Sequence, residues 1–161
     1  MPTDSRTPTP WPRRQRRLKV TFSERPLFFL TICTHKRRRI LANNEAHEAF
    51  TSFCLASLEK AEVWVGRYVL MPDHLHVFAC AKESHNISRW VASLKKFMAK
   101  HWRHSGLVAP FWQKGFFDHV LRTGESYSQE WGYIRENPVS AGLVRSVDDW
   151  PYQGEIHNLW W

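Results

Sequence analysis

The spacing of apolar residues along the chain predicts short strands separated by turns. Segments rich in Phe, Val, Ile and Leu cover residues 26–34, 62–71 and 115–122, and such β-prone runs bounded by polar residues are typical of strands. A further strand is expected to start at His74, because Pro72 and the aspartate after it favour a tight turn. The pattern therefore predicts a four-stranded sheet.

Helical spacing fills the segments between these strands. Residues 86–104 give the clearest helix, since apolar side chains recur there at i, i+3, i+4, i+7, i+10 and i+11 from Ile87. Further helices are expected over residues 45–60 and 126–136, the latter ending near Pro138. The order is β-α-β-β-α-β with an appended helix, which predicts an α+β, ferredoxin-like fold.

The composition favours a polyanionic partner. The chain has 161 residues, of which 43% are hydrophobic, so it can bury the core of one domain. Its formal net charge of +8, with nine tryptophans and ten phenylalanines, points to nucleic acid more than to a merely solvated basic surface. The three cysteines form no CxxC pair, so we expect buried thiols in a reducing cytoplasm rather than a zinc knuckle or disulfides.

Residues 1–19 combine four prolines with clustered arginines, so we interpret 1–19 as a flexible basic arm and 20–161 as the folded domain. Such an arm could contact phosphates or simply keep the chain in solution. The sequence holds no run of 18 apolar residues and no signal-peptide pattern, which predicts no membrane span and a cytoplasmic protein.

Two histidines share one face of the strand that starts at His74. Alternation puts His74, His76, Phe78 and Cys80 on one side, with Leu75 and its alternate neighbours on the other. Imidazoles about 7 Å apart along a strand can converge on one divalent cation. Two polar residues at a sheet edge would give the same pattern, so the spacing leaves both interpretations open.

A tyrosine lies on the polar side of the last predicted helix. At roughly 100° per residue, one stripe expected to pack on the domain contains Tyr127, Trp131 and Ile134. The polar side contains Ser126, Glu130, Tyr133 and Asn137. A tyrosine one turn from an amide suits a nucleophile beside a metal ligand, and a half-exposed packing tyrosine is the alternative.

Three short motifs carry a family resemblance. "MPDHLH", "WQKGFFDHVLR" and "YIRENPVSAGLV" occur in this order, followed by "DDWPY". In these motifs the chain resembles the REP-associated tyrosine transposases, part of the wider IS200/IS605-type group of single-tyrosine HUH nucleases, from about residue 18 to about residue 152. The resemblance implies a ferredoxin-like fold, which agrees with the element order.

The resemblance also implies a site. The family's histidine pair falls on His74 and His76, its nucleophilic tyrosine on Tyr133, and the amide that completes metal binding on Asn137. It implies Mg²⁺ or Mn²⁺ as cofactor, with Tyr133 attacking single-stranded DNA to leave a 5′-phosphotyrosine and a free 3′-hydroxyl. The sequence does not choose between two possible helpers of the tyrosine, His119 and Glu130.

The implied substrate is single-stranded DNA with a palindromic hairpin, such as a repetitive extragenic palindrome. Basic residues expected to contact phosphate are Lys95, Lys96, Lys100, Arg103 and Arg122, although each could be an ordinary surface charge. Trp112, in the "WQ" motif, could stack a base or belong to the core. A monomer is favoured for this subgroup, with a dimer as the alternative.

Two other functions compete with a transposase. A domesticated protein could bind hairpins without cutting them, but such a protein need not keep Tyr133, His74, His76 and Asn137 together. A metal-dependent hydrolase of small substrates would not need a charge of +8. The sequence therefore favours the enzyme acting on DNA.

Overall fold

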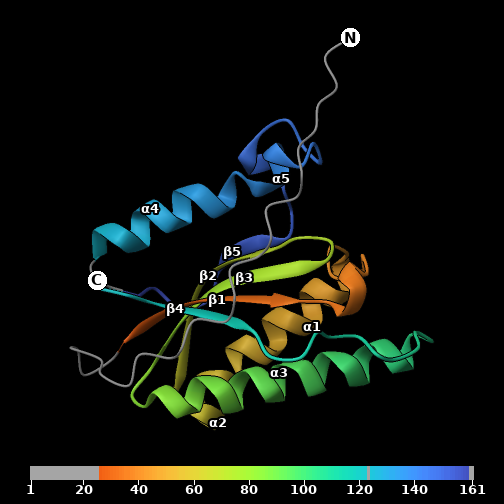
Figure 1. Ribbon diagram of the computed structural model, residues 1–161, viewed down its shortest axis with the longest axis horizontal. Helices are drawn as coiled ribbons and strands as arrows, with labels where there is room; N and C mark the ends of the chain where they lie inside the picture. The colour runs from red at the N-terminus through yellow and green to blue at the C-terminus, as the bar shows by residue number, and fades with distance from the viewer. Residues whose placement is uncertain (1–25, 123, 160–161) are drawn as a thin grey trace.

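A computed structural model describes residues 26–122 and 124–159 of the chain. Its centre is an antiparallel sheet with the strand order β4-β1-β3-β2-β5, shown edge-on in Figure 1. The strands are β1 (Leu27–Cys33), β2 (Val63–Leu70), β3 (His74–Ala81), β4 (Phe117–Leu121) and β5 (Gln153–Glu155). The predicted ferredoxin-like order is confirmed for the first four strands, and β5 extends the sheet beyond β2.

Helices cover both faces of the sheet. One face carries α1 (Asn44–Leu55), α2 (Ser57–Ala61) and α3 (Ser84–His104), and the other carries α4 (Gly124–Arg135), which is followed by the short α5 (Asn137–Ser140). Asn43 caps α1, since its side chain accepts a hydrogen bond from the Ala46 amide. Figure 1 shows the sheet between the α3 layer and α4.

The two faces of β3 are occupied as alternation predicts. Leu75, Val77, Ala79 and Ala81 lie in the larger core, against α1 and α3, together with Trp90 and Leu94 of α3. Phe78 and Cys80 lie in a second cluster against Tyr127 and Ile134 of α4. The histidines therefore belong to the α4 face of the sheet.

Element ends differ from the prediction in three places. The helix expected over 45–60 is interrupted at Ala56, and the helix carrying Tyr133 ends at Arg135, before α5 begins at Asn137. The strand β5 has no apolar alternation that a sequence pattern could reveal. It pairs antiparallel with β2, with Val69 opposite Gln153. Just before β5, the Leu70 amide donates to the Tyr152 carbonyl at 2.8 Å and the Trp150 indole donates to the Leu70 carbonyl at 3.0 Å.

Other expectations are also met within the described residues. Cys33, Cys54 and Cys80 are buried and form no disulfide, as expected of small apolar side chains. Over residues 26–122 and 124–159, no helix combines the length and apolar character needed to cross a membrane. The predicted arm, residues 1–19, lies outside the described residues.

Candidate active site

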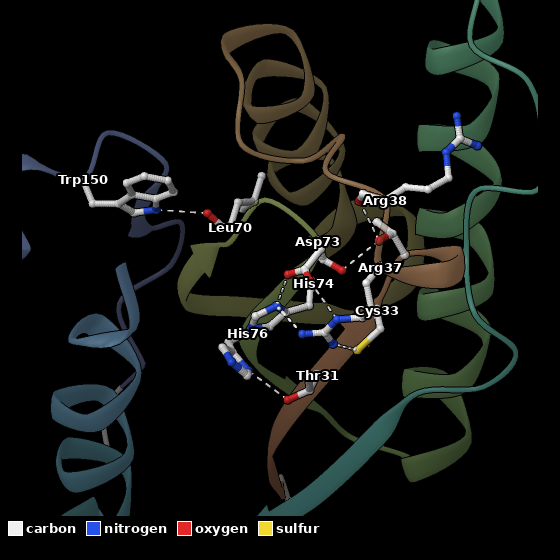
Figure 2. A network of polar contacts seen from close by, with 10 residues as sticks. Thr31, Cys33, Arg37, Arg38, Leu70, Asp73, His74, His76 and Trp150 are labelled. Atoms are coloured by element: carbon white, nitrogen blue, oxygen red, sulfur yellow. Dashed lines mark hydrogen bonds and ion pairs between the residues drawn. The ribbon is translucent and has the colours of Figure 1, made fainter. Parts of the chain in front are cut away.

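The histidine pair is buried on the α4 face of the sheet, where β3 begins. His74 is 8% exposed and His76 is 7% exposed. Their ring centroids are 4.8 Å apart and the ring planes are nearly perpendicular. Figure 2 shows both side chains beside β1, with Asp73, Arg37 and Thr31 around them. Two imidazoles this close can share one ligand.

Asp73 fixes the orientation of His74. The Oδ1 atom of Asp73 lies 2.7 Å from His74 Nδ1, and Nη2 of Arg37 lies 3.3 Å from the same nitrogen. One nitrogen cannot donate to Asp73 and accept from Arg37 at once. The shorter distance and the acceptor-only carboxylate favour Nδ1–H donating to Asp73, so Nε2 is the nitrogen that would bind a cation.

Arg37 holds Asp73 in turn. Its Nε donates to Asp73 Oδ2 at 2.8 Å and its Nη1 donates to the Cys33 sulfur at 3.1 Å. Arg37 has a left-handed backbone (φ 56°). Thr34 anchors the turn, because its backbone amide donates to the Asp73 carbonyl at 3.0 Å and its hydroxyl donates to the Arg38 carbonyl at 2.7 Å. Burial alone would raise the pKa of Asp73, but His74 and Arg37 outweigh it and lower that pKa. The carboxylate stays charged as a result.

Thr31 and Phe29 fix His76. The His76 Nδ1 atom is hydrogen-bonded to Thr31 Oγ1 at 2.8 Å, and the imidazole stacks on the Phe29 ring with 5.3 Å between centroids. Burial lowers the pKa of His76 to about 3, with contributions from the charges of His74 and Arg37. The neutral imidazole, which is the metal-binding form, therefore dominates at neutral pH.

These contacts suit a divalent cation. Histidines that bind metals usually donate their other ring N–H to a carboxylate or another oxygen, as His74 does to Asp73. Among residues 26–122 and 124–159, no group of three or more His, Cys, Asp or Glu could hold a metal ion. An amide oxygen, such as that of Asn137, is a ligand type that suits Mg²⁺ or Mn²⁺.

The apolar stripe predicted for the last helix packs on the sheet. Tyr127 and Ile134 are 5% and 1% exposed. Arg67 of β2 stacks over Tyr127 and Trp131, at 5.2 Å and 5.6 Å from the ring centroids. A Cβ at Gly66 would lie 2.9 Å from the Tyr127 hydroxyl, so glycine there permits the close approach of α4.

Tyr133 points to solvent on the other side of α4. Its side chain is 73% exposed, while Asn137 and Glu130 are partly buried. Within the described residues, no hydrogen bond joins Tyr133 or Asn137 to the histidines. The structure thus places Tyr133 on the helix that covers the histidine face, with its hydroxyl accessible to a large substrate.

The basic residues predicted to contact DNA are divided by the fold. Lys96, Lys100 and Arg103 are exposed on α3, on the opposite side of the sheet from the histidine pair (Figure 1). The Lys95 ammonium instead donates to the carbonyls of Gln113 and Gly115, at 2.8 Å and 2.5 Å. Lys95 therefore has a structural role that its charge did not reveal.

One of the remaining candidates lies on β4, another directly follows that strand, and a third belongs to the core. His119 is exposed and pairs with Phe29, so it shares the sheet face of His76. Arg122 is exposed at the end of β4. Trp112 is partly buried against Trp102, and its indole donates to the Lys95 carbonyl at 3.0 Å, which supports the core interpretation rather than base stacking.

Sequence reasoning missed the residues that hold the histidines. The sequence predicts Asp73 only as part of a turn and predicts no role for Arg37. The adjacency of Asp73 to His74 was the only available signal, because Arg37 and Thr31 are 37 and 45 residues away from their histidine partners.

Loss of the Asp73 carboxylate should weaken metal binding. We expect Asp73→Ala to lower Mn²⁺ affinity about 10- to 100-fold, the usual effect of removing a hydrogen-bond partner of a histidine ligand. Asp73→Asn should lose less, because its amide oxygen can still accept from Nδ1–H. Titration of Mn²⁺ followed by electron paramagnetic resonance measures this without DNA.

The matched control is Asp148→Asn. Asp148 forms a comparable ion pair with Arg135 at 2.8 Å, but it is 82% exposed and contacts neither histidine. Its replacement should leave Mn²⁺ affinity unchanged. Equal Mn²⁺ affinity in Asp73→Ala and the parent protein would show that Asp73 does not position His74 for a cation.

Comparisons with known proteins agree on one family. The model of the family described as "Transposase IS200 like" matches residues 28–137, so the chain belongs to the IS200-like transposases. A REP-associated tyrosine transposase of Escherichia coli (strain K12) is 31% identical over 90 residues, which cover 55% of this chain and 52% of that protein. The matched region thus spans about half the length of this relative.

Two further proteins match over more of the chain. A provisionally named REP-associated tyrosine transposase of Haemophilus influenzae (strain ATCC 51907 / DSM 11121 / KW20 / Rd) is 27% identical over 146 residues, or 81% of this chain and 80% of that protein. A solved structure of a REP-associated tyrosine transposase bound to a REP hairpin superposes with a TM-score of 0.64 and 21% identity, over 86% of this chain and 82% of that chain. That likeness establishes the shared fold.

Proposed function

We propose that this protein cleaves and rejoins single-stranded DNA at hairpins, with Tyr133 as nucleophile and a divalent cation held by His74 and His76. The observation that carries the proposal is the histidine pair: two buried imidazoles 4.8 Å apart, oriented by Asp73 and Thr31. They lie on the sheet face that α4 covers, and α4 carries the exposed Tyr133. Asn137, just after α4, is the proposed third ligand.

The chemistry follows from a tyrosine hydroxyl meeting a phosphodiester. The Tyr133 oxygen forms a bond to phosphorus, the bond from phosphorus to the 3′ oxygen breaks, and that oxygen leaves as a 3′-hydroxyl after taking a proton. The Tyr133 proton passes to a base, for which Glu130 and His119 are the proposed candidates. Attack by a second 3′-hydroxyl on the phosphotyrosine reverses these steps and rejoins the strand.

The residues around the histidines would help to position a cation against the phosphate that is cleaved. A bound Mg²⁺ or Mn²⁺ supplies Lewis-acid stabilisation of the charge that develops on the phosphate oxygens. Asp73 and Thr31 hold the imidazoles in position, which avoids reorganisation during the reaction. The 73% exposure of the Tyr133 side chain leaves its hydroxyl accessible to a DNA strand.

Hairpin DNA is the substrate class that the family and the charge support. A related transposase of the same fold has been solved bound to a REP hairpin. The net charge of +8 favours a polyanion. Arg122, exposed just after β4, could contact its phosphates, whereas Lys96, Lys100 and Arg103 lie on the side of the sheet opposite the histidine pair (Figure 1). A non-cleaving hairpin-binding protein would share these features but not the need for a nucleophile.

The deciding experiment is covalent capture. Incubation with a set of hairpin oligonucleotides labelled on the strand 3′ of the hairpin should give a protein–DNA adduct that survives denaturing electrophoresis. We expect the adduct with Mg²⁺ or Mn²⁺ and at least about a 100-fold loss of its formation rate in EDTA, since the cation offsets charge worth several kcal/mol.

Two results would reject the proposal. Full adduct formation in EDTA would exclude a role for the cation. Tight binding of hairpins with no adduct under any metal condition would favour the non-cleaving DNA-binding protein.

A further inference from the structure

A small pocket opens beside the histidine pair, on the same face of the sheet. It has a volume of about 190 Å³ and is lined by Thr31 and Cys33 of β1 and by residues 113–117. Thr31 is the residue whose hydroxyl is bonded to His76, and the Cys33 sulfur accepts from Arg37. The pocket therefore begins one side chain away from the proposed cation site.

The wall of this pocket is held in place by the rest of the fold. The backbone amide of Gln113 donates to the Cys33 carbonyl at 3.0 Å, and the Lys95 ammonium donates to the backbone carbonyls of Gln113 and Gly115. Gly115 makes the bend with φ 71°, a conformation that favours glycine. A preformed pocket binds its ligand without an ordering cost.

The lining combines an aromatic surface with polar groups at the mouth. Phe117 pairs with Thr31 in the β1–β4 register, so its ring lies on the same side of the sheet as His76. Phe117 and Phe116 are partly buried, whereas Gln113 and Lys114 are exposed. Aromatic rings stack nucleobases, an amide can bond a base edge, and an ammonium pairs with phosphate.

We propose that this pocket binds one unpaired nucleotide next to the cleaved phosphodiester. The base packs on the Phe117 ring, the side-chain amide of Gln113 contacts the edge of the base, and the Lys114 ammonium contacts the adjoining phosphate. The inference rests on the proposed function, because the histidine pair defines where the cleaved bond lies. The proposal assigns base stacking to Phe117 instead of Trp112, because the Trp112 ring is packed against the core.

The test compares two DNA ligands in EDTA, so that binding is measured without cleavage. One is a blunt REP-type hairpin, and the other is the same stem with unpaired nucleotides on both sides. The parent protein should bind the flanked hairpin more tightly. Phe117→Leu should reduce that preference by about 5-fold or more, the lower range for loss of one stacked base, while its affinity for the blunt hairpin changes less than about 2-fold.

A fluorescent base and a matched control complete the design. 2-Aminopurine placed at each flanking position should be quenched by the parent protein at one position, and Phe117→Leu should reduce that quenching. Phe97→Leu removes a 41% exposed ring from α3, on the other side of the sheet, and should leave both measurements unchanged. The pocket assignment would be overturned if Phe117→Leu weakened the affinity for the blunt and the flanked hairpin to the same extent. It would also be overturned if Phe117→Leu left the 2-aminopurine quenching unchanged.

The covalent-capture assay separates the two proposals. An adduct formed by a protein whose flank preference does not depend on Phe117 would reject the pocket and keep the nuclease. A Phe117-dependent flank preference without any adduct would support the pocket and reject cleavage.

Discussion

A Tyr133→Phe protein will form no covalent adduct with hairpin DNA, although it will still bind that DNA. The substitution removes one hydroxyl from a side chain that is 73% exposed, so it should leave the fold intact. A phenyl ring cannot attack phosphorus, and loss of a nucleophile lowers a reaction rate by factors on the order of 10³ or more. Denaturing electrophoresis measures the adduct, and fluorescence anisotropy measures the binding.

Tyr127→Phe is the matched control on the same helix. Tyr127 is 5% exposed and packs edge-on against Phe78, and its hydroxyl lies 3.4 Å from the Arg67 amide nitrogen. Loss of that weak hydrogen bond should cost about 1 kcal/mol of stability at most and should leave adduct formation near the parent rate. An adduct in Tyr133→Phe but not in Tyr127→Phe would assign the nucleophile to the buried tyrosine.

Replacement of both His74 and His76 by leucine should remove cation binding and, with it, cleavage. Leucine fills much of the imidazole volume but has no atom that can bind a cation. We expect the Mn²⁺ affinity and the adduct rate each to fall at least about 100-fold, the loss expected when the direct ligands rather than their supports are removed. Metal titration and covalent capture measure the two effects.

Leucine is preferable to alanine because the pair is buried. His76 stacks on Phe29 and both imidazoles are less than a tenth exposed, so truncation to alanine would leave a cavity and destabilise the fold. His104→Leu, on the exposed end of α3, is the control and should leave Mn²⁺ affinity and adduct rate unchanged. Parental Mn²⁺ affinity in the doubly substituted protein would exclude the histidines as ligands.

Local periodicity was enough to predict the framework of the site. The alternation around His74 and His76 placed them on one face because a strand has a strict period of two. The spacing of Tyr127, Trp131 and Ile134 identified the buried side of α4 for the same kind of reason. Such patterns reflect burial, because the positions of a segment that face the core are occupied by apolar residues of that same segment.

Long-range contacts were not predictable in this way. The partners of the histidines on β1 and in the turn after it come from distant segments, and no pattern of charges marks Arg37 among its basic neighbours. Lys95 and Trp112 resemble DNA-binding residues by type, but both are used in hydrogen bonds within the fold. Lys95 donates to the carbonyls of Gln113 and Gly115, and the Trp112 indole donates to the Lys95 carbonyl. Only the packing of residues 112–115 on α3 distinguishes these roles.

The register between β2 and β3 sets how this chain can vary in length. Leu70 pairs with Leu75, and only residues 71–73 separate the two strands. One residue added or removed after this turn would rotate β3 by one position and send both imidazoles into the apolar core beneath α3, with Leu75 and Val77 taking their places on the α4 face. We therefore expect this hairpin to tolerate substitution of its residues better than a change of its length by one residue.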